Sequence, residues 1–189
     1  MSKNKVKYGI CNVHYAKATL TDENKVTYEK PVALPGARAI TISPTSELGK
    51  FYADNILYHQ TPGSSGYEGT LEVAVITDEF CIDILGDKKD NKGGIVEVNL
   101  AQGSYFALLF QFEGDTKATR HCLYYCKANR PELTGETAEE TVEPGTETLT
   151  LSATARPDNG YVKYRTSVDM DETAYKNWFE EVPEPAFAE

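Results

Sequence analysis

The stretch YFALLFQFE, residues 105–113, places large apolar residues at every second position. In a β-strand successive side chains point to opposite faces, so this alternation predicts a strand that buries one face. Residues 148–155, TLTLSATA, repeat the pattern, with leucine and alanine alternating against threonine and serine. The strongest periodicity in the chain is therefore that of a β-sheet. The four residues expected on the buried face of the first strand are Phe106, Leu108, Phe110 and Phe112.

Shorter β-rich runs extend this pattern along most of the chain. Asn159-Gly160 stands before the run 161–168, and Asn-Gly between two β-rich runs is a strong signal for a hairpin turn. We therefore expect a mostly β protein in which neighbouring strands run antiparallel. The remaining candidate strands are 6–15, 37–43, 67–76, 95–99 and 120–127.

Two segments have the features of helices instead. Thr77 is a good N-cap, acidic residues follow it and Gly86 closes the segment, which predicts a short helix over about 78–86. Asp171 can cap a second helix over 172–181, which two prolines then end. An apolar stripe with helical spacing indicates that this second helix docks on another surface. The stripe consists of Tyr175, Trp178, Phe179 and Val182.

Length and composition restrict the class of protein. The chain has 189 residues, of which 40% are hydrophobic and 25% charged, as is typical of one globular domain. It contains no apolar run of the roughly 20 residues that a membrane-spanning helix needs. The N-terminal residues lack the apolar segment of a secretory signal, so we expect the four cysteines to be reduced thiols in a protein made in the cytoplasm.

The net charge of −10 is unevenly distributed. Residues 1–131 carry 15 acidic and 15 basic side chains, whereas residues 132–189 carry 14 acidic and 4 basic ones. Such an acidic field repels phosphate, which argues against specific nucleic-acid binding. The acidic segment 132–147 is interpreted either as a solvated loop or as a functional surface facing DNA or a basic partner. The polar segment 44–66, rich in Gly, Ser and Pro, is predicted to be a long loop.

Catalytic and metal-binding patterns are not found in the sequence. His121, Cys122 and Cys126 resemble metal ligands, but residues four apart on a strand are about 13 Å apart. That spacing is too large for two thiolates on one zinc ion, and His121 is expected on the opposite face. No phosphate-binding loop or nucleophile motif is present. We therefore expect neither an enzyme nor a protein that needs a metal or cofactor.

Several stretches, in order along nearly the whole chain, resemble one known family. The chain is similar to the phi13-type major tail proteins of long-tailed phages and prophages of Gram-positive bacteria. The combination of FYADN, GYEGTLE and the block from RP to ETL carries most of the resemblance. The matching stretches are GICNVHYA (9–16), PVALPGA (31–37), FYADNILY (51–58), GYEGTLEVAVITDEFCIDILG (66–86), FALLFQFEGD (106–115), RHCLYYCKANRP (120–131), residues 135–166 and YKNWFEEVPEP (175–185).

The resemblance implies both a fold and a role. The fold would be an antiparallel β-sandwich of the tail-tube type over residues 1–170, with one flanking short helix and a long stacking loop, followed by a C-terminal helix and tail over 171–189. The role would be that of a major tail tube subunit in the virion, assembled in the host cytoplasm. Hexameric rings would stack into a hollow tube through which DNA is ejected without specific binding. The net charge of −10 adds the hypothesis that the wall of this tube is net-acidic. The implied partners are further copies of the chain, a tape measure protein, a tail terminator and a distal tail or baseplate protein, with no membrane.

Six residues are candidate subunit or ring contacts under this interpretation. Phe51 and Tyr52 would anchor the segment 44–66 to the adjacent ring, because aromatic side chains often dominate interface energies. Trp178 and Phe179 would dock either on the subunit's own sandwich or on a neighbour, and the sequence leaves both open. The full set is Phe51, Tyr52, Asn55, Tyr67, Trp178 and Phe179.

Other classes of protein share part of these features. A tail terminator or distal tail protein would form single rings that do not grow. A monomeric ligand-binding β-sandwich would need exposed Tyr or Trp platforms, but the only Trp lies in a predicted helix. A tail-like bacteriocin tube would have the same sequence pattern as a phage tube.

Overall fold

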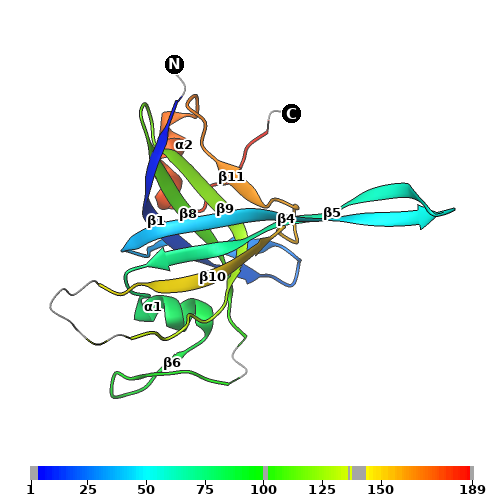
Figure 1. Cartoon of the computed structure of the whole chain (residues 1–189). Helices are drawn as coiled ribbons and strands as arrows, with labels where there is room; N and C mark the ends of the chain where they lie inside the picture. The colour runs from blue at the N-terminus through cyan, green and yellow to red at the C-terminus, as the bar shows by residue number, and fades with distance from the viewer. Residues whose placement is uncertain (1–3, 100–101, 136, 138–143, 188–189) are drawn as a thin grey trace.

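The computed structural model describes residues 4–99, 102–135, 137 and 144–187, and it is mostly antiparallel β-sheet (Figure 1). One nine-stranded sheet has the order β2-β1-β8-β9-β10-β5-β4, with β3 paired to β1 and β11 paired to β9. Strands β6 and β7 form a separate pair. The strands are β1 (Lys7–Leu20), β2 (Val26–Tyr28), β3 (Val32–Ala33), β4 (Ala37–Ala53), β5 (Ile56–Val73), β6 (Lys88–Lys89), β7 (Ile95–Val96), β8 (Tyr105–Gly114), β9 (Thr119–Ala128), β10 (Glu147–Thr154) and β11 (Lys163–Arg165).

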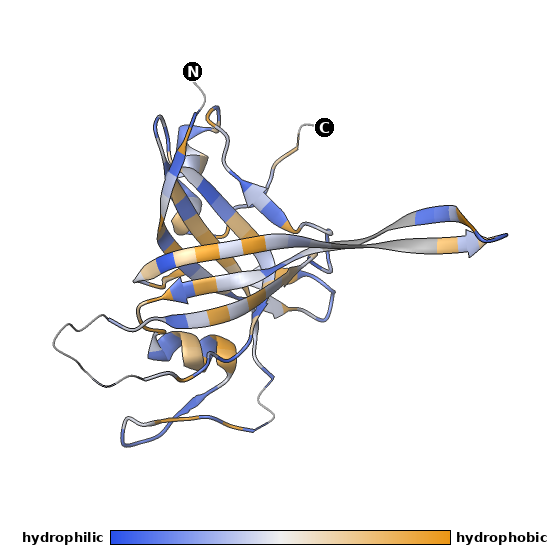
Figure 2. Cartoon of the chain, viewed as in Figure 1, coloured by the Kyte–Doolittle hydropathy of each residue, from blue (hydrophilic) through white to orange (hydrophobic). Residues whose placement is uncertain are grey.

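The large sheet bends so that its two halves enclose one core, which confirms the predicted β-sandwich architecture. Strands β1, β8 and β9 form one half, and β10, β5 and the first part of β4 form the other (Figure 1). Apolar residues alternate with polar ones along these strands (Figure 2). Phe106, Leu108 and Phe110 of β8 are buried in this core, and Phe112 packs at its edge, as the alternation predicts.

A second apolar cluster covers the outer face of β8 and β9. Its buried members come from the outward side of the strands and from the C-terminal segment. Both faces of β8 are therefore buried, because the C-terminal segment packs on the outer one. The cluster consists of Ala16, Ala107, Leu109, Cys122, Tyr124, Trp178 and Val182.

The short helix near the middle of the chain is confirmed. Helix α1 (Asp78–Phe80) continues into the π-helical turn η1 (Cys81–Leu85). The Thr77 hydroxyl accepts a hydrogen bond from the Phe80 N–H, and Gly86 closes the helix in the left-handed conformation with φ of 82°. Phe80 is fully buried against Tyr15 and Phe106, so the helix caps one end of the core.

The C-terminal helix is shorter than predicted. Helix α2 (Glu172–Lys176) begins at the Asp171 cap, whose carboxylate accepts hydrogen bonds from two backbone N–H groups. It then tightens into the 3-10 turn η2 (Asn177–Phe179). None of the helices in the described part of the chain is long and apolar enough to cross a membrane.

The predicted hairpin at Asn159-Gly160 is wrong in its pairing. The chain does reverse there, with the Gly160 N–H donating to the Arg156 carbonyl, but β10 and β11 do not pair with each other. Both pair with the same edge of β9, β10 along Tyr125–Ala128 and β11 along His121–Leu123. Residues 155–162 are thus a loop that leaves this edge and returns to it.

The prediction that Cys122 and Cys126 share one face of β9, with His121 on the other face, is wrong. The register of β8 on β9 shifts between Phe106 and Leu108, which marks a bulge in the ladder. As a result Cys122 lies in the outer cluster and Cys126 in the core, on opposite faces. His121 lies on the core side, stacked on Phe110 with ring centroids 5.1 Å apart.

Candidate assembly surface

The segment predicted as a loop over 44–66 is instead the outer part of a long β-hairpin. Strands β4 and β5 stay paired from Ala37–Val73 to Ala53–Ile56, and the hairpin projects far beyond the body of the protein (Figure 1). We call the part beyond Pro44 and Gly66 the arm. Asp54 and Asn55 turn the chain with φ of 52° and 62°, both in the left-handed region. Two such residues are typical of the type I′ turn, whose twist matches that of a two-stranded ribbon.

The end of the arm carries a cluster of exposed apolar side chains. Phe51 and Tyr52 are each 61% exposed, and Tyr58 is 69% exposed. The register shifts between Phe51 and Tyr52, and the rings of Phe51 and Tyr58 meet edge to face with centroids 6.5 Å apart. Large exposed apolar patches commonly mark interaction surfaces. We call this set the arm tip: Phe51, Tyr52, Ile56, Leu57 and Tyr58.

A cleft lies at the base of the arm, on the open side of the core. It has a volume of about 370 Å³, and its walls are about equally polar and apolar. Tyr67 lines it and is half-buried, with the Lys163 ammonium 4.6 Å from its ring centroid. We call it the base cleft, and its lining is Lys7, Ile40, Thr41, Ile42, Tyr67, Phe110, Phe112, His121, Leu123 and Lys163.

His121 is uncharged in this cleft at neutral pH. Burial, followed by the charges of Lys163, Arg165 and Lys7, lowers the pKa of His121 from 6.5 to about 4. The imidazole packs on Phe110 and Phe112 and acts as part of an aromatic wall.

The lowered pKa of His121 predicts a pH-dependent stability. Between about pH 6.5 and pH 4 the unfolded chain binds a proton at His121 that the folded chain does not, so stability falls as the pH falls through this window. We expect His121→Phe to flatten this part of the profile, measured as the free energy of unfolding in urea at pH 7 and pH 4.5. The mutation His59→Phe, at a solvent-exposed histidine of the arm, is the matched control. An equal slope in the wild type and His121→Phe would contradict the assignment.

Gly69 fixes the strand pairing from which the arm extends. It lies in β5 opposite Ile42, and a Cβ at this position would overlap the carbonyl oxygen of Thr41. We expect Gly69→Ala to destabilise the protein by about 1–3 kcal/mol, as overpacking commonly does. Gly9→Ala is the control, because a Cβ there meets nothing within 4 Å. Thermal unfolding would show a lower Tm for Gly69→Ala alone, and equal Tm values would contradict the close approach.

Trp178 and Phe179 lie on this chain's own body. Trp178 is fully buried, with its ring centroid 5.2 Å from that of Tyr164. Phe179 is half-buried and stacks on His14 at 4.8 Å. In this structure Trp178 is a packing residue with no exposed surface to offer a neighbouring subunit.

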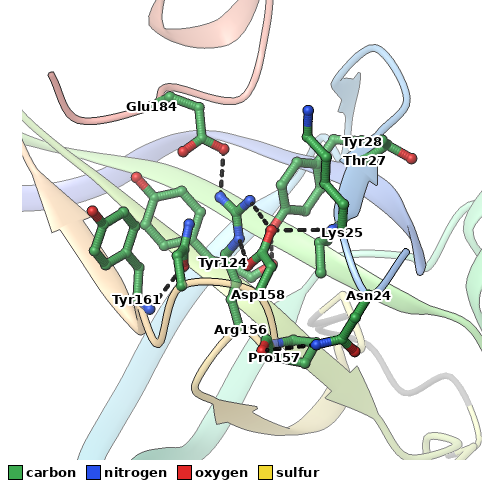
Figure 3. A network of polar contacts seen from close by, with 12 residues as sticks. Asn24, Lys25, Thr27, Tyr28, Tyr124, Arg156, Pro157, Asp158, Tyr161 and Glu184 are labelled. Atoms are coloured by element: carbon green, nitrogen blue, oxygen red, sulfur yellow. Dashed lines mark hydrogen bonds and ion pairs between the residues drawn. The ribbon is translucent and has the colours of Figure 1, made fainter. Parts of the chain in front are cut away.

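An ionic cluster fastens the end of the C-terminal segment (Figure 3). Arg156 is 4% exposed, pairs with both Asp158 and Glu184, and lies 5.3 Å from the ring centroids of Tyr28 and Tyr124. Burial would raise the pKa of Asp158, but hydrogen bonds from Arg156 and the Val26 N–H outweigh it and lower that pKa. The cluster joins three distant parts of the chain and holds residue 184 in place.

The described residues contain no group of three or more His, Cys, Asp or Glu side chains placed to hold a metal ion. Tyr105 and Tyr125 stack face to face with centroids 4.0 Å apart, so they pack mainly on each other. Of the acidic segment 132–147, residues 136 and 138–143 lie outside the described residues.

The structure brings together only some of the residues singled out from the sequence. Phe51 and Tyr52 lie at the arm tip, and Asn55 forms its turn. Tyr67 lies at the base of the arm, and Trp178 and Phe179 lie on the body. The sequence analysis did not single out Ile56, Leu57 and Tyr58, although the Asp54-Asn55 turn signal places them next to Phe51 and Tyr52.

Comparisons with known proteins show a weak similarity to solved structures. The chain matches no protein-family model and no curated protein sequence. Among solved structures, a chain of the six-fold symmetrised cryo-EM structure of the anti-feeding prophage baseplate is similar to it. The similarity covers 90% of this chain and 100% of the other, with 12% sequence identity and a TM-score of 0.48. Values this low assign neither a family nor a function.

Proposed function

We propose that this chain is a structural subunit of a phage tail, and specifically a tail tube protein that polymerises into stacked hexameric rings. The observation that carries the proposal is the arm, which holds five large apolar side chains in solvent beyond the body of the protein. Exposing such a tip is unfavourable in an isolated subunit, and burying it against another molecule removes the apolar area from water. This role needs no catalytic residue, metal or cofactor.

Two sheet edges offer a means of closing a ring. Among the described residues, the outermost strands β2 and β4 each pair with one neighbour only, β1 and β5 respectively. Their outer edges therefore present backbone N–H and C=O groups to solvent. Pairing the β4 edge of one subunit with the β2 side of the next would satisfy these groups and remove edges that otherwise promote aggregation.

The arm offers a second, different contact. A contact that joins two unlike surfaces is heterologous, and repeated heterologous contacts produce either closed rings or open filaments. We assign ring closure to the sheet edges and stacking to the arm. The net charge of −10 suits a tube through which DNA passes without binding, because an acidic wall repels phosphate.

The family resemblance supplies the remaining parts of the proposal. A tail tube subunit would be assembled in the host cytoplasm and remain in the virion. Its partners would be further copies of the chain, a tape measure protein, a tail terminator and a distal tail or baseplate protein. None of these contacts requires a membrane.

Sedimentation velocity over a concentration series tests the polymerisation. We expect a monomer at low concentration and a sharp change to large assemblies above a threshold, because a polymer that grows from a nucleus forms cooperatively. If the chain remains monomeric, addition of tail-tip complexes should start growth. A chain that stays monomeric with these complexes present, or that stops at one discrete ring, would contradict the tube assignment.

A further inference from the structure

The base cleft has the composition of a docking site for a segment that is partly apolar and partly charged. Its walls include Phe110, Phe112 and Leu123, and the pKa of His121 keeps that residue neutral at pH 7. Its volume of about 370 Å³ lies within the 300–1,000 Å³ that ligand pockets commonly have. Covering the apolar half of this surface with another apolar surface removes it from water, which is favourable.

Two lysines give the cleft a positive rim. The Lys7 ammonium lies 4.7 Å from the ring centroid of Phe112, and the Lys163 ammonium lies 4.6 Å from that of Tyr67. Neither lysine forms an ion pair with a carboxylate of the described residues, and none of the lining residues is acidic. The cleft therefore suits a segment that is apolar and carries a negative charge.

The arm tip is such a segment. Its aromatic and aliphatic side chains flank the turn, and Asp54 is the only acidic residue between Phe51 and Gln60. Asp54 stands at the far end of the hairpin, so its carboxylate leads any insertion of the tip into a cleft. The negative end of the tip would then meet the rim formed by Lys7 and Lys163.

The tip cannot reach the cleft of its own chain. Ile42 lines the base cleft, and Asp54 follows it by twelve residues along the same continuous strand. At about 3.3 Å per residue, this places the turn about 40 Å from the cleft. The paired arm points away from the body (Figure 1), so only another molecule can bring a tip to this cleft.

We propose that the arm tip of one copy docks in the base cleft of a second copy, with Asp54 against Lys7 and Lys163. This inference rests on the proposed tube function and specifies its stacking contact. Each copy carries one tip and one cleft, so every joint leaves an unused tip at one end and an unused cleft at the other. Such a joint gives the assembly a direction and lets it grow.

Site-specific photo-crosslinking of the full chain locates the contact directly. Tyr58 is replaced by p-benzoylphenylalanine, and assemblies are irradiated and mapped by mass spectrometry. We expect crosslinks between copies that fall on the residues lining the base cleft. The same probe at Leu133, an exposed position outside the arm and the cleft lining, is the control and should not label the cleft. Crosslinks from position 58 to another surface, or no crosslinks between copies, would overturn the inference.

Electron microscopy of the same samples separates this inference from the proposed function. Tubes with crosslinks outside the cleft would contradict the docking site and leave the tube assignment intact. An absence of rings and tubes even with tail-tip complexes would contradict both.

A charge exchange tests the polar part of the contact. Asp54→Lys and Lys163→Glu should each raise the threshold concentration for assembly by about fivefold, as exposed ion pairs of good geometry do. The two substitutions in one chain should restore most of the loss, since the opposite charges meet again. Glu132→Lys, at an exposed acidic residue outside the arm and the cleft lining, is the control. A double variant that assembles no better than the single variants would count against the pairing.

Discussion

Removing the two aromatic anchors of the arm, with Phe51→Ala and Tyr52→Ala in one chain, is expected to abolish assembly while leaving the monomer folded. Both side chains are 61% exposed in the isolated subunit, so their truncation removes no core packing. Aromatic anchors at interfaces are commonly worth about 2 kcal/mol or more each. A loss of about 4 kcal/mol at the stacking contact would raise the threshold concentration about a thousandfold. Sedimentation velocity measures this shift, and circular dichroism confirms the folded monomer.

A matched variant separates the arm from general surface hydrophobicity. Phe187→Ala together with Leu133→Ala also removes two exposed large apolar side chains, but neither residue lies on the arm or lines the base cleft. We expect this control to assemble nearly as the wild type does. An equal loss of assembly in both variants would show that the arm does not form the stacking contact. Normal assembly of the Phe51→Ala and Tyr52→Ala variant would show the same.

Of the substitutions considered, Trp178→Ala is expected to lower the free energy of unfolding most. Its side chain is fully buried in the outer cluster and packs on Tyr164, so Trp178→Ala leaves a large cavity beside β8 and β9. Truncations of this size typically cost about 3–5 kcal/mol. Urea denaturation of the monomer should show this loss directly in the free energy of unfolding.

Truncation after Met170 extends the same test. It removes Trp178, Val182 and Glu184, which leaves the outer faces of Ala107, Leu109 and Tyr124 uncovered. We expect the truncated chain to lose its folded monomer. A truncated chain that folds with normal stability but fails to polymerise would instead show that the C-terminal segment acts between subunits.

Most of the β architecture follows from the sequence because buried faces leave a period-two pattern. Residues 105–113 and 148–155 have one face directed into the core, and both were predicted as strands. The arm could not be recognised in this way. It has no core of its own to cover, so nothing selects for alternation, and its Gly, Ser and Pro residues are typical of loops.

The pairing errors have local physical causes. The Asn159-Gly160 signal correctly places a reversal, but β10 and β11 both pair with β9, and Arg156 in the loop between them is buried and paired with Asp158 and Glu184. The bulge in β9 moves Cys122 and Cys126 to opposite faces, and a bulge leaves no clear signal in hydropathy.

The candidate surfaces were only partly predictable. Phe51 and Tyr52 were predicted as anchors because the family resemblance implies a stacking segment and aromatic side chains often dominate interface energies. The base cleft draws its walls from β1, β4, β5, β8, β9 and β11, so its residues are scattered from position 7 to position 163. Only the bend of the sheet brings them together.

Negative-stain electron microscopy of the concentrated full chain, alone and with tail-tip complexes, tests the central claim most directly. The tail tube proposal predicts hollow tubes or stacked six-fold rings, formed either spontaneously or by growth from the added tips. Single rings that never stack would point to a tail terminator or distal tail protein. A chain that stays monomeric when tail-tip complexes are added would contradict the assignment as a tail tube subunit.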